Sequence, residues 1–467
     1  MDRVLHASGL FDVVWANTLE PLVRIGRDGQ PVSMLATKWE PSADLTKWRF
    51  QLREGVKFHS GEPFAAQDVV ATAKYLLALG ETSQVLKFVP LKDAVEVDSK
   101  TVDLIFANPQ PLLPITLNYF LIYPAAVARD NRELARTAVI GTGPYKFVEW
   151  VKGQNIKLTR FEGYWGPRPQ IADVVVTFRA EQGVRLAALQ AREVDWVTDL
   201  SPEQAAQAPK VAQGLDPNTF WIRFDEAVQK EWTGSDPLFA DERLRLAVDY
   251  AMDRKSLVDL FAGQAVPSQG QFASPADFGF DRELKSRPYD LERARALVQQ
   301  AGAAGKTVTL MGTSDRALHD REVAEAVASM IQKSGLKVSL MVLPFAEVNA
   351  YQKTASAGQT KKMVDMLIFP SDVVLESESR FGQIFTKGGT QFALNDLEPT
   401  RLFAQVKATA DYDKRGQLLA QAWAYVYSHA HYVPLFRPPR LWGLAKNLDW
   451  TPDILGNGVV ADMKFMD

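Results

Sequence analysis

The sequence predicts an α/β fold in two lobes, because two separate regions alternate strands with helices and a linker-like stretch lies between them. The clearer region spans residues 307–370. It carries strand, helix, strand and strand patterns in turn, at Val308–Met311, Asp320–Lys333, Val338–Leu343 and Met363–Phe369. Strands joined through a helix of this length form βαβ units, so we expect a parallel or mixed sheet here.

The second alternating region is shorter. Strand-like Val174–Arg179 is followed by a helical pattern at Gln182–Ala191 and by strand-like Asp195–Thr198. This order predicts a second α/β unit. The linker-like stretch near Glu231–Pro237 separates the two regions, and we therefore expect two lobes with a cleft.

Apolar residues at helical spacing predict four further helices. Acidic residues, which favour the first turn of a helix, and glycines, which favour the position after its end, set several of the expected bounds. The expected helices are Phe64–Leu79, Asp241–Ala262, a helix capped by Asp290 and ended by Gly302, and Asp411–His429.

Two blocks rich in glycine and aromatic residues read as scaffolding, because they contain no nucleophile, metal ligand set or phosphate loop. In the first block, Trp48–Phe64, short strands alternate with glycine turns. In the second, strands at Tyr145–Trp150 and Asn155–Thr159 flank a turn in which Gly153 can adopt a positive φ at little cost. Such blocks are suited to holding a molecule and not to converting it.

Composition excludes several classes of function. The chain has 467 residues with a net charge of −3, which leaves no footprint for nucleic acid or an anionic membrane. No apolar run approaches the ~20 residues of a membrane span, since prolines break the richest stretch, 112–128. Cysteine is absent, which excludes disulfides, thiolate metal sites and cysteine nucleophiles. No signal peptide precedes Asp2, and we expect a trimmed or misplaced start.

Apparent enzyme motifs do not survive inspection. Gly302–Thr307 lacks the first glycine of a phosphate loop and reads as a helix end and a turn, and Ser334–Lys337 reads as a loop between helix and strand. His429 and His431 are expected to cap carbonyl groups at a helix end, and His59 to be structural or at the surface. Glu376–Glu378 is expected to be a solvated face. No cofactor is implied.

Seven segments, in order along nearly the whole chain, resemble one family. They are Leu19–Arg24 with Asp28-Gly29, Leu35–Glu40, Leu52–Val70, Gly141–Gly166, Asp241–Arg254, Tyr289–Gly302 and Val433–Phe436. Together they resemble the family-5 extracellular solute-binding proteins, the dipeptide- and oligopeptide-binding receptors of ABC importers. Family members usually begin with a signal and a β-strand before the segment that resembles Asp2–Leu22, and we expect both to be absent from this sequence.

The resemblance implies a two-lobed periplasmic-binding-protein fold of type II, cluster C, with an extra inserted sub-domain. Lobe I would be discontinuous, the chain would cross between lobes near Trp232–Pro237 and Tyr432–Arg437, and the two crossings would form a hinge. The implied boundaries are 1–38, 171–232 and 436–467 for lobe I, 39–170 for the inserted sub-domain and 233–435 for lobe II.

The resemblance also suggests ligand-binding residues. Family members carry an acid three positions after a Trp, which pairs with the ammonium group of the ligand. Here Phe369-Pro-Ser-Asp372 has that spacing, with Phe in place of Trp. It implies that Asp372 is an ammonium anchor, with Phe369 and Ser371 beside it. On general grounds Asp372 is equally well a turn-forming residue after a strand.

Three other residues are candidates, each with a structural alternative. Asp225 replaces a family Asn at the end of a strand and would favour a cationic ligand if it points inward. Arg437 would meet a carboxylate or else form a salt bridge at the rim. Trp15 would be an apolar wall of the pocket or else part of a core.

The expected function is that of a periplasmic receptor, without enzymatic activity, that delivers a peptide or peptide-like organic solute to the permease subunits of an ABC importer. Opines, amines, oligosaccharides and metal chelates are alternative ligands on the same scaffold. A carboxylate-dependent hydrolase is the alternative from another class. We expect a monomer with no nucleic-acid partner and no membrane insertion.

Overall fold

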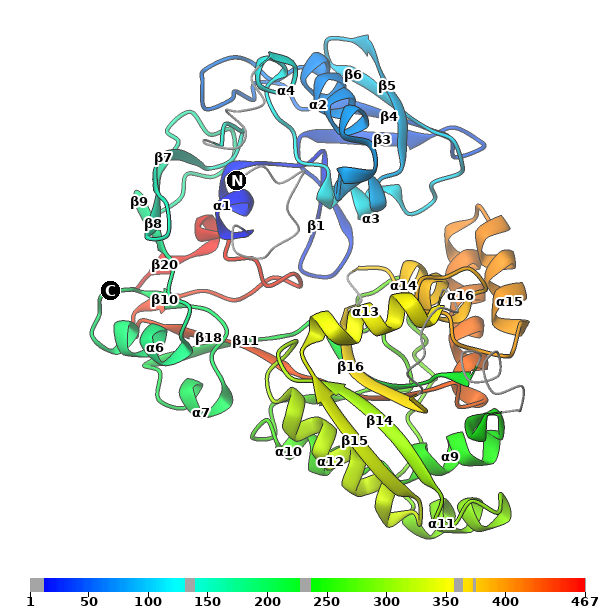
Figure 1. Cartoon of the computed structure of the whole chain (residues 1–467). Coiled ribbons are helices and arrows are strands. Elements are labelled where there is room, and N and C mark those ends of the chain that lie inside the picture. Colours follow the sequence, from blue (N-terminus) through cyan, green and yellow to red (C-terminus); the bar gives the residue numbers. More distant parts are fainter. Residues whose placement is uncertain (1–11, 131–138, 227–236, 357–363, 373–374, 467) are drawn as a thin grey trace. The chain divides into compact units, whose positions relative to one another are not determined.

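The computed structural model describes residues 12–130, 139–226, 237–356, 364–372 and 375–466, and it divides into two compact units (Figure 1). The first unit comprises Met1–Leu200, Gln204–Gly214 and Leu441–Asp467, and the second comprises Ser201–Glu203 and Leu215–Arg440. The three-part division expected from the sequence is finer than these two units, and it stays a prediction. The expected crossing near Trp232–Pro237 lies largely outside the described residues.

The first unit is built from several small sheets. One sheet has the order β3-β4-β6-β5, a second β7-β8-β9 and a third β10-β18-β11, and β1-β2 and β19-β20 are two-stranded. The strands are β1 (Val23–Ile25), β2 (Pro31–Ser33), β3 (Ala36–Pro41), β4 (Lys47–Leu52), β5 (Leu91–Asp98), β6 (Thr101–Phe106), β7 (Tyr145–Val151), β8 (Asn155–Arg160), β9 (Asp173–Thr177), β10 (Trp196–Val197), β11 (Lys210–Leu215), β18 (Pro439–Leu444), β19 (Leu448–Asp449) and β20 (Lys464–Phe465). Helices of the same region are α1 (Asp12–Thr18), α2 (Ala66–Leu79), α3 (Leu113–Thr116), α4 (Ala125–Asp130), α6 (Gln182–Gln190) and the short α7 (Pro202–Ala205).

The second unit contains a six-stranded mixed sheet in the order β13-β17-β12-β16-β14-β15. Its strands are β12 (Asn218–Phe224), β13 (Val266–Pro267), β14 (Thr307–Thr313), β15 (Lys337–Leu343), β16 (Met366–Asp372) and β17 (Tyr432–Arg437). The helices are α9 (Glu242–Tyr250), α10 (Arg254–Asp259), α11 (Leu291–Gln300), α12 (Asp320–Lys333), α13 (Phe345–Ser356), α14 (Glu378–Phe385), α15 (Glu398–Ala408) and α16 (Tyr412–Ser428). The βαβ prediction is confirmed, because β14 pairs in parallel with both β15 and β16.

The expected helix ends follow from local capping. Asp290 accepts a hydrogen bond from the backbone N–H of Arg293, and Asp411 does the same for Lys414, so both act as the predicted N-caps. Gly302 adopts φ +64° just past α11, which confirms that Gly302–Thr307 is a helix end and a turn into β14.

Two expectations about elements are wrong. The helix predicted over Asp241–Ala262 is two helices, because Asp253 caps α10 through the backbone N–H of Ser256 and so ends continuous helix formation before it. The strands predicted around Val174 and Asp195 do not form one α/β unit. β9 pairs along its length with β8, and β10 pairs with β18, so they belong to different sheets.

The two glycine and aromatic blocks of the first unit interlock around His59. Its Nδ1 accepts from the N–H of Gly141 at 3.2 Å, and its Nε2 donates to the carbonyl oxygen of Gly143 at 2.9 Å. Burial therefore lowers the pKa of His59 to about 4, which confirms a structural role. A Cβ on Gly141 would stand 2.1 Å from the carbonyl oxygen of Thr18, so only glycine fits there.

Glu20 also binds the second block, through hydrogen bonds to its side chains. Its buried carboxylate accepts hydrogen bonds from Thr142 Oγ1 at 2.7 Å, Tyr164 OH at 2.9 Å and Trp165 Nε1 at 2.9 Å. Desolvation raises the pKa of Glu20 in spite of these donors. The block is thus a rigid frame, as its composition predicted.

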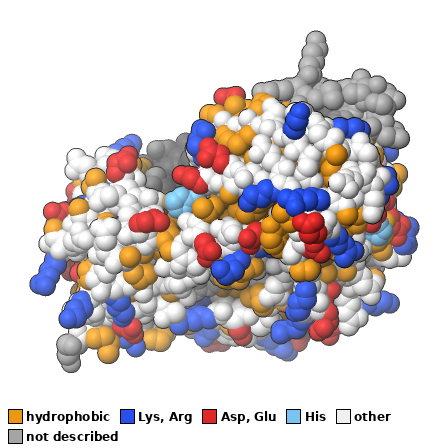
Figure 2. All heavy atoms as spheres, turned by 90° about the horizontal axis from the view of Figure 1, so that it is seen from below, with side chains coloured by type: hydrophobic (Ala, Val, Ile, Leu, Met, Phe, Trp, Pro, Cys, Tyr) orange, Lys and Arg blue, Asp and Glu red, His pale blue; other side chains and the backbone are white. Residues whose placement is uncertain are grey.

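The distribution of charge on the surface and the apolar character of the helices can be compared with the composition. On the face drawn in Figure 2, basic and acidic side chains are interspersed with hydrophobic ones, as a net charge of −3 suggests. Among the described residues, no helix combines the length and apolar character of a membrane span.

Candidate functional site

Four of the five predicted ligand residues of the second unit lie toward one edge of its sheet, where β16 and β17 end and β12 begins. They are Phe369, Ser371, Asp372 and Arg437. β12 pairs with β16, so that Asn218 faces Asp372 and Thr219 faces Ser371. On its other side β12 pairs with β17, where Phe436 faces Phe220 and Arg437 follows. Since neighbouring strands lie ~4.8 Å apart, the backbones of Asp372 and Arg437 stand about 10 Å apart, on either side of the first residues of β12.

An aromatic cluster packs beneath these strand ends. The ring of Trp221 lies 5.2 Å from that of Phe369 and 4.8 Å from that of Phe272, measured between centroids, and all three side chains are buried. The indole Nε1 of Trp221 donates to Ser371 Oγ at 3.0 Å. Phe369 and Ser371 are therefore held in place by Trp221, which the sequence prediction did not single out.

Arg437 is buried in an environment that compensates its charge only in part. Its guanidinium, 12% exposed, donates to the carbonyl oxygen of Phe272 at 2.8 Å and lies 3.8 Å from Asp277 Oδ2. Burial lowers the pKa of Arg437, although Asp277 and Asp216 oppose that shift. Among the described residues, the carboxylate nearest to this cation is therefore beyond hydrogen-bonding distance.

Asp277 itself is occupied elsewhere. Its Oδ2 accepts from the backbone N–H and the hydroxyl of Ser274, both at 2.7 Å. Burial raises the pKa of Asp277 above its usual value. The sequence offered no signal for this residue, since the loop that carries it shows no periodic pattern.

Glu376 and Glu378 correct the expectation of a solvated face. Glu378 is 5% exposed, because Arg415 reaches it from α16 with Nε 2.7 Å from Oε2. Glu376 is 9% exposed, receives the backbone N–H of Ser379 at 2.9 Å and has its pKa raised by burial to about 7. Arg415 lies in the apolar stripe of the helix predicted at Asp411–His429. A charged residue at such a position indicates an oppositely charged residue buried against it, so the sequence did contain a sign of a buried acid.

The histidine pair is also corrected in part. His429 Nδ1 lies 3.0 Å from the carbonyl oxygen of Tyr425, as predicted for a helix end. His431 instead lies between two acids, with Nε2 3.0 Å from Asp396 Oδ2 and Nδ1 3.6 Å from Glu226 Oε1. Within the described ranges, no His, Asp and Glu side chains gather into a group that would hold a metal ion.

The structure does not bring Asp225 to the strand ends that carry Asp372 and Arg437. Asp225 follows the other end of β12, seven residues from Asn218, or about 23 Å along an extended strand. Its carboxylate is buried, with Arg223 Nη2 at 2.6 Å and Tyr351 OH at 2.9 Å. Burial raises the pKa of Asp225.

The two remaining candidate ligand residues are Trp15 and Asp372. Trp15, on α1 of the first unit, is 2% exposed and belongs to the core cluster of that unit. Asp372 ends β16, but its side chain lies outside the described residues. The assignment of all six candidates to ligand binding stays a prediction.

The fold is shared with solved structures of one class of protein. Solved structures at 20–22% identity share the mixed α/β fold of cluster C periplasmic binding proteins over the full length. AgaA of A. tumefaciens R10, in complex with agropinic acid, is 21% identical with a TM-score of 0.74, covering 100% of this chain and 96% of its own. DppA of Helicobacter pylori, with the peptide STSA, is 22% identical with a TM-score of 0.72, covering 99% and 95%.

The family follows from the sequence match. Residues 30–389 match the bacterial extracellular solute-binding proteins, family 5 middle region, and the chain belongs to this family. The dipeptide-binding protein of Escherichia coli K12 is 24% identical over 439 residues, which cover 85% of this chain and 79% of that protein. The chain is therefore a solute-binding component of an ABC transporter, a family of receptors and not of enzymes, which implies a small ligand and permease partners.

Proposed function

We propose that this protein captures a short peptide or peptide-like solute and that the β12, β16 and β17 ends of the second unit supply its charged contacts. The E. coli relative is named for dipeptide binding, and the H. pylori structure holds a peptide. Both names favour a peptide ligand over the other solutes that this scaffold carries.

A zwitterion matches the charges at these strand ends. Asp372 would pair with the ammonium group, and Arg437 would receive a carboxylate on the opposite side of β12. The observation that carries this proposal is the partly compensated guanidinium of Arg437, which lies 3.8 Å from Asp277 Oδ2. An incoming carboxylate would complete its charge-assisted hydrogen bonds, each worth about 1.5–3 kcal/mol.

Capture would couple to closure of two lobes. A solute that contacts both lobes binds the closed state better, and it shifts the population by that difference in affinity. We further propose that the receptor works as a monomer in the periplasm. A solute that produces no compaction in small-angle scattering would argue against this closure.

Opines are the second candidate ligands, because AgaA, solved with agropinic acid, covers the same full length. An opine also carries carboxylates and an amine-derived nitrogen, so it would draw on the same two residues. Amines, oligosaccharides and metal chelates complete the set of solutes to be tested.

A thermal-shift panel of these solutes tests the proposal. A ligand at 100 times its Kd adds about 2.7 kcal/mol to the folded state, which for a unit of this size raises Tm by about 5–10 °C. Asp372→Asn and Arg437→Lys should lose most of the shift given by dipeptides, whereas Asp413→Asn, on the exposed side of α16, should keep it. Full shifts in both site variants would remove these residues from the ligand site.

A further inference from the structure

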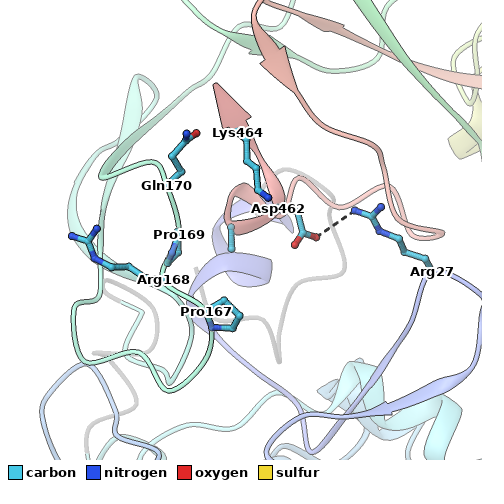
Figure 3. Close-up of a pocket in the computed structure, with 8 residues that line it drawn as sticks. Arg27, Pro167, Arg168, Pro169, Gln170, Asp462 and Lys464 are labelled. Carbon is cyan, nitrogen blue, oxygen red and sulfur yellow. Dashed lines mark ion pairs between the residues drawn. The ribbon is translucent and has the colours of Figure 1, made fainter. Parts of the chain in front are cut away.

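A groove of 660 Å³ lies in the first unit where three segments distant in sequence meet (Figure 3). It is lined by Arg27, Pro167–Gln170, Ala461, Asp462 and Lys464. Arg27 comes from the turn between β1 and β2, the prolines from the connection between β8 and β9, and the last residues from the segment that ends in β20. None of these residues belongs to the proposed solute site.

The wall formed by Pro167–Gln170 is fixed by hydrogen bonds between side chains and backbone groups. Arg160 Nη1 donates to the carbonyl oxygens of Pro169 at 3.0 Å and Gln170 at 3.1 Å. The carboxamide of Gln170 in turn bonds both backbone groups of Phe465, accepting at 2.7 Å and donating at 3.2 Å. The proline wall and the C-terminal wall are therefore clamped to one another.

The other two walls are anchored as well. Buried Asn17 accepts from the N–H of Val460 at 2.8 Å and donates to the carbonyl oxygen of Gly458 at 2.8 Å, which holds the segment before Asp462. The turn that carries Arg27 is closed by the N–H of Gly26, which donates to the carbonyl oxygen of Gln30 at 2.8 Å. The groove is thus formed before any partner arrives, which lowers the entropic cost of binding.

The charged side chains of the groove are only partly paired. Arg168 makes a two-point contact with Glu162, at 3.0 and 3.1 Å. Arg27 is 60% exposed and lies 3.9 Å from Asp462 Oδ2, too far for a hydrogen bond. Lys464 is exposed, and no ion pair with its ammonium group is found in the part of the chain that the structure describes. Of the three cations that line the groove, Arg168 is thus paired with Glu162, and Arg27 and Lys464 share Asp462 as the one carboxylate of the lining.

We propose that this groove docks an acidic segment of a protein partner, and that the partner is the permease implied by the transporter family. Solvent screens an exposed ion pair and leaves it weak, so a lone small anion would gain little here. A segment with several carboxylates can engage Arg27 and Lys464 together and cover the proline wall beside them. Such complementary charge also speeds the encounter of two proteins.

A fluorescent hexaglutamate peptide with blocked termini is a suitable probe, because it offers six side-chain carboxylates to the groove and lacks the terminal ammonium group that Asp372 of the proposed solute site would pair with. Anisotropy at low salt should show saturable binding to the full chain, weakened at physiological ionic strength, where the Debye length is about 8 Å. The double variant Arg27→Ala/Lys464→Ala should bind about tenfold more weakly, as expected for the loss of two exposed ion pairs.

A charge-matched control is Lys57→Ala/Lys92→Ala, which removes two exposed cations from the first unit away from the groove. Three results would overturn the docking proposal: no saturable binding by the unaltered chain, equal weakening in both double variants, or displacement of the peptide by free glutamate at equal concentration. Thermal shifts by dipeptides should be unchanged in the groove variant, so failure of docking is distinguishable from failure of the proposed solute site.

Discussion

Removal of the His431 imidazole should destabilise the second unit in a pH-dependent way. The side chain is 3% exposed and lies between Asp396, from the loop before α15, and Glu226, just after β12. Other groups around it are Arg245 on α9, with Nη1 3.6 Å from Glu226 Oε1, and Tyr425 on α16, whose hydroxyl donates to Asp396 at 2.9 Å. The ring of His429 stacks on this cluster, 6.0 Å from that of His431.

The magnitude follows from burial and distance. Loss of one partner of a buried ion pair costs about 3–5 kcal/mol. We expect the low end, about 3 kcal/mol, for His431→Ala, because Asp396 is 27% exposed and Arg245 still faces Glu226. For a unit of this size that corresponds to a fall in Tm of about 6–12 °C.

The dependence on pH has a definite sign. Burial alone lowers the pKa of His431, but the hydrogen bond to Asp396 and the attraction of Glu226 outweigh it and raise the pKa above its usual value. The stabilisation is therefore complete below the unfolded pKa of about 6.5, and it is lost as pH rises through the folded value.

Calorimetry at several pH values between 5 and 9 measures this effect, with His429→Ala as a control two residues away. The difference in stability between the unaltered chain and His431→Ala should be greatest at the acid end and shrink toward pH 9, while His429→Ala should cost about 1 kcal/mol or less. A difference that stays constant over this range, or an equal cost for His429→Ala, would refute the reasoning.

Three further predictions concern packing, a buried acid and a buried hydrogen bond. Gly141→Ala should destabilise the first unit by about 1–3 kcal/mol in chemical denaturation, because the new Cβ would lie 2.1 Å from the carbonyl oxygen of Thr18. The control is Gly183→Ala, in α6 with open space around it, which should be neutral or stabilising by up to about 1 kcal/mol. The pKa of Glu376 is raised to about 7, so folding stability should fall as pH rises from 4.5 to 7, by at most about 3 kcal/mol. Denaturation curves of Glu376→Gln should lack this fall. An unchanged dependence of stability on pH in this variant would contradict the raised pKa of Glu376. Ser371→Ala should cost about 1–3 kcal/mol, since Trp221 Nε1 would lose its acceptor in a buried site; Ser339→Ala, on β15, serves as the control, and equal losses would argue against the bond.

Local patterns accounted for several regular elements of the second unit. The helix at Asp320–Lys333 and the caps at Asp290 and Asp411 were predicted from residues within a few positions of each boundary. The same local rules missed the break between α9 and α10, because the apolar stripe continues across Asp253 while its side chain caps a new helix.

The candidate site was predictable only in part. The spacing of Phe369 and Asp372 was visible in the sequence, and so was a cation after Phe436. The pairing of β12 with β16, about 150 residues apart in the chain, places Asn218 beside Asp372 at one edge of the sheet. It leaves Asp225 at the opposite end of β12. The acids beside Arg437 and the burial of Glu376 likewise arise from contacts between distant loops.

The sequence by itself determined the family, the strand–helix alternation, the glycine-framed blocks and the absence of thiol chemistry, because each is encoded in residues near one another or in composition. The tertiary structure alone decided which strands pair, which charges are buried and which loops form the groove at Arg27 and Lys464. Burial and strand pairing bring residues together across the chain, and a carboxylate acquires its pKa and its partners only once that has happened.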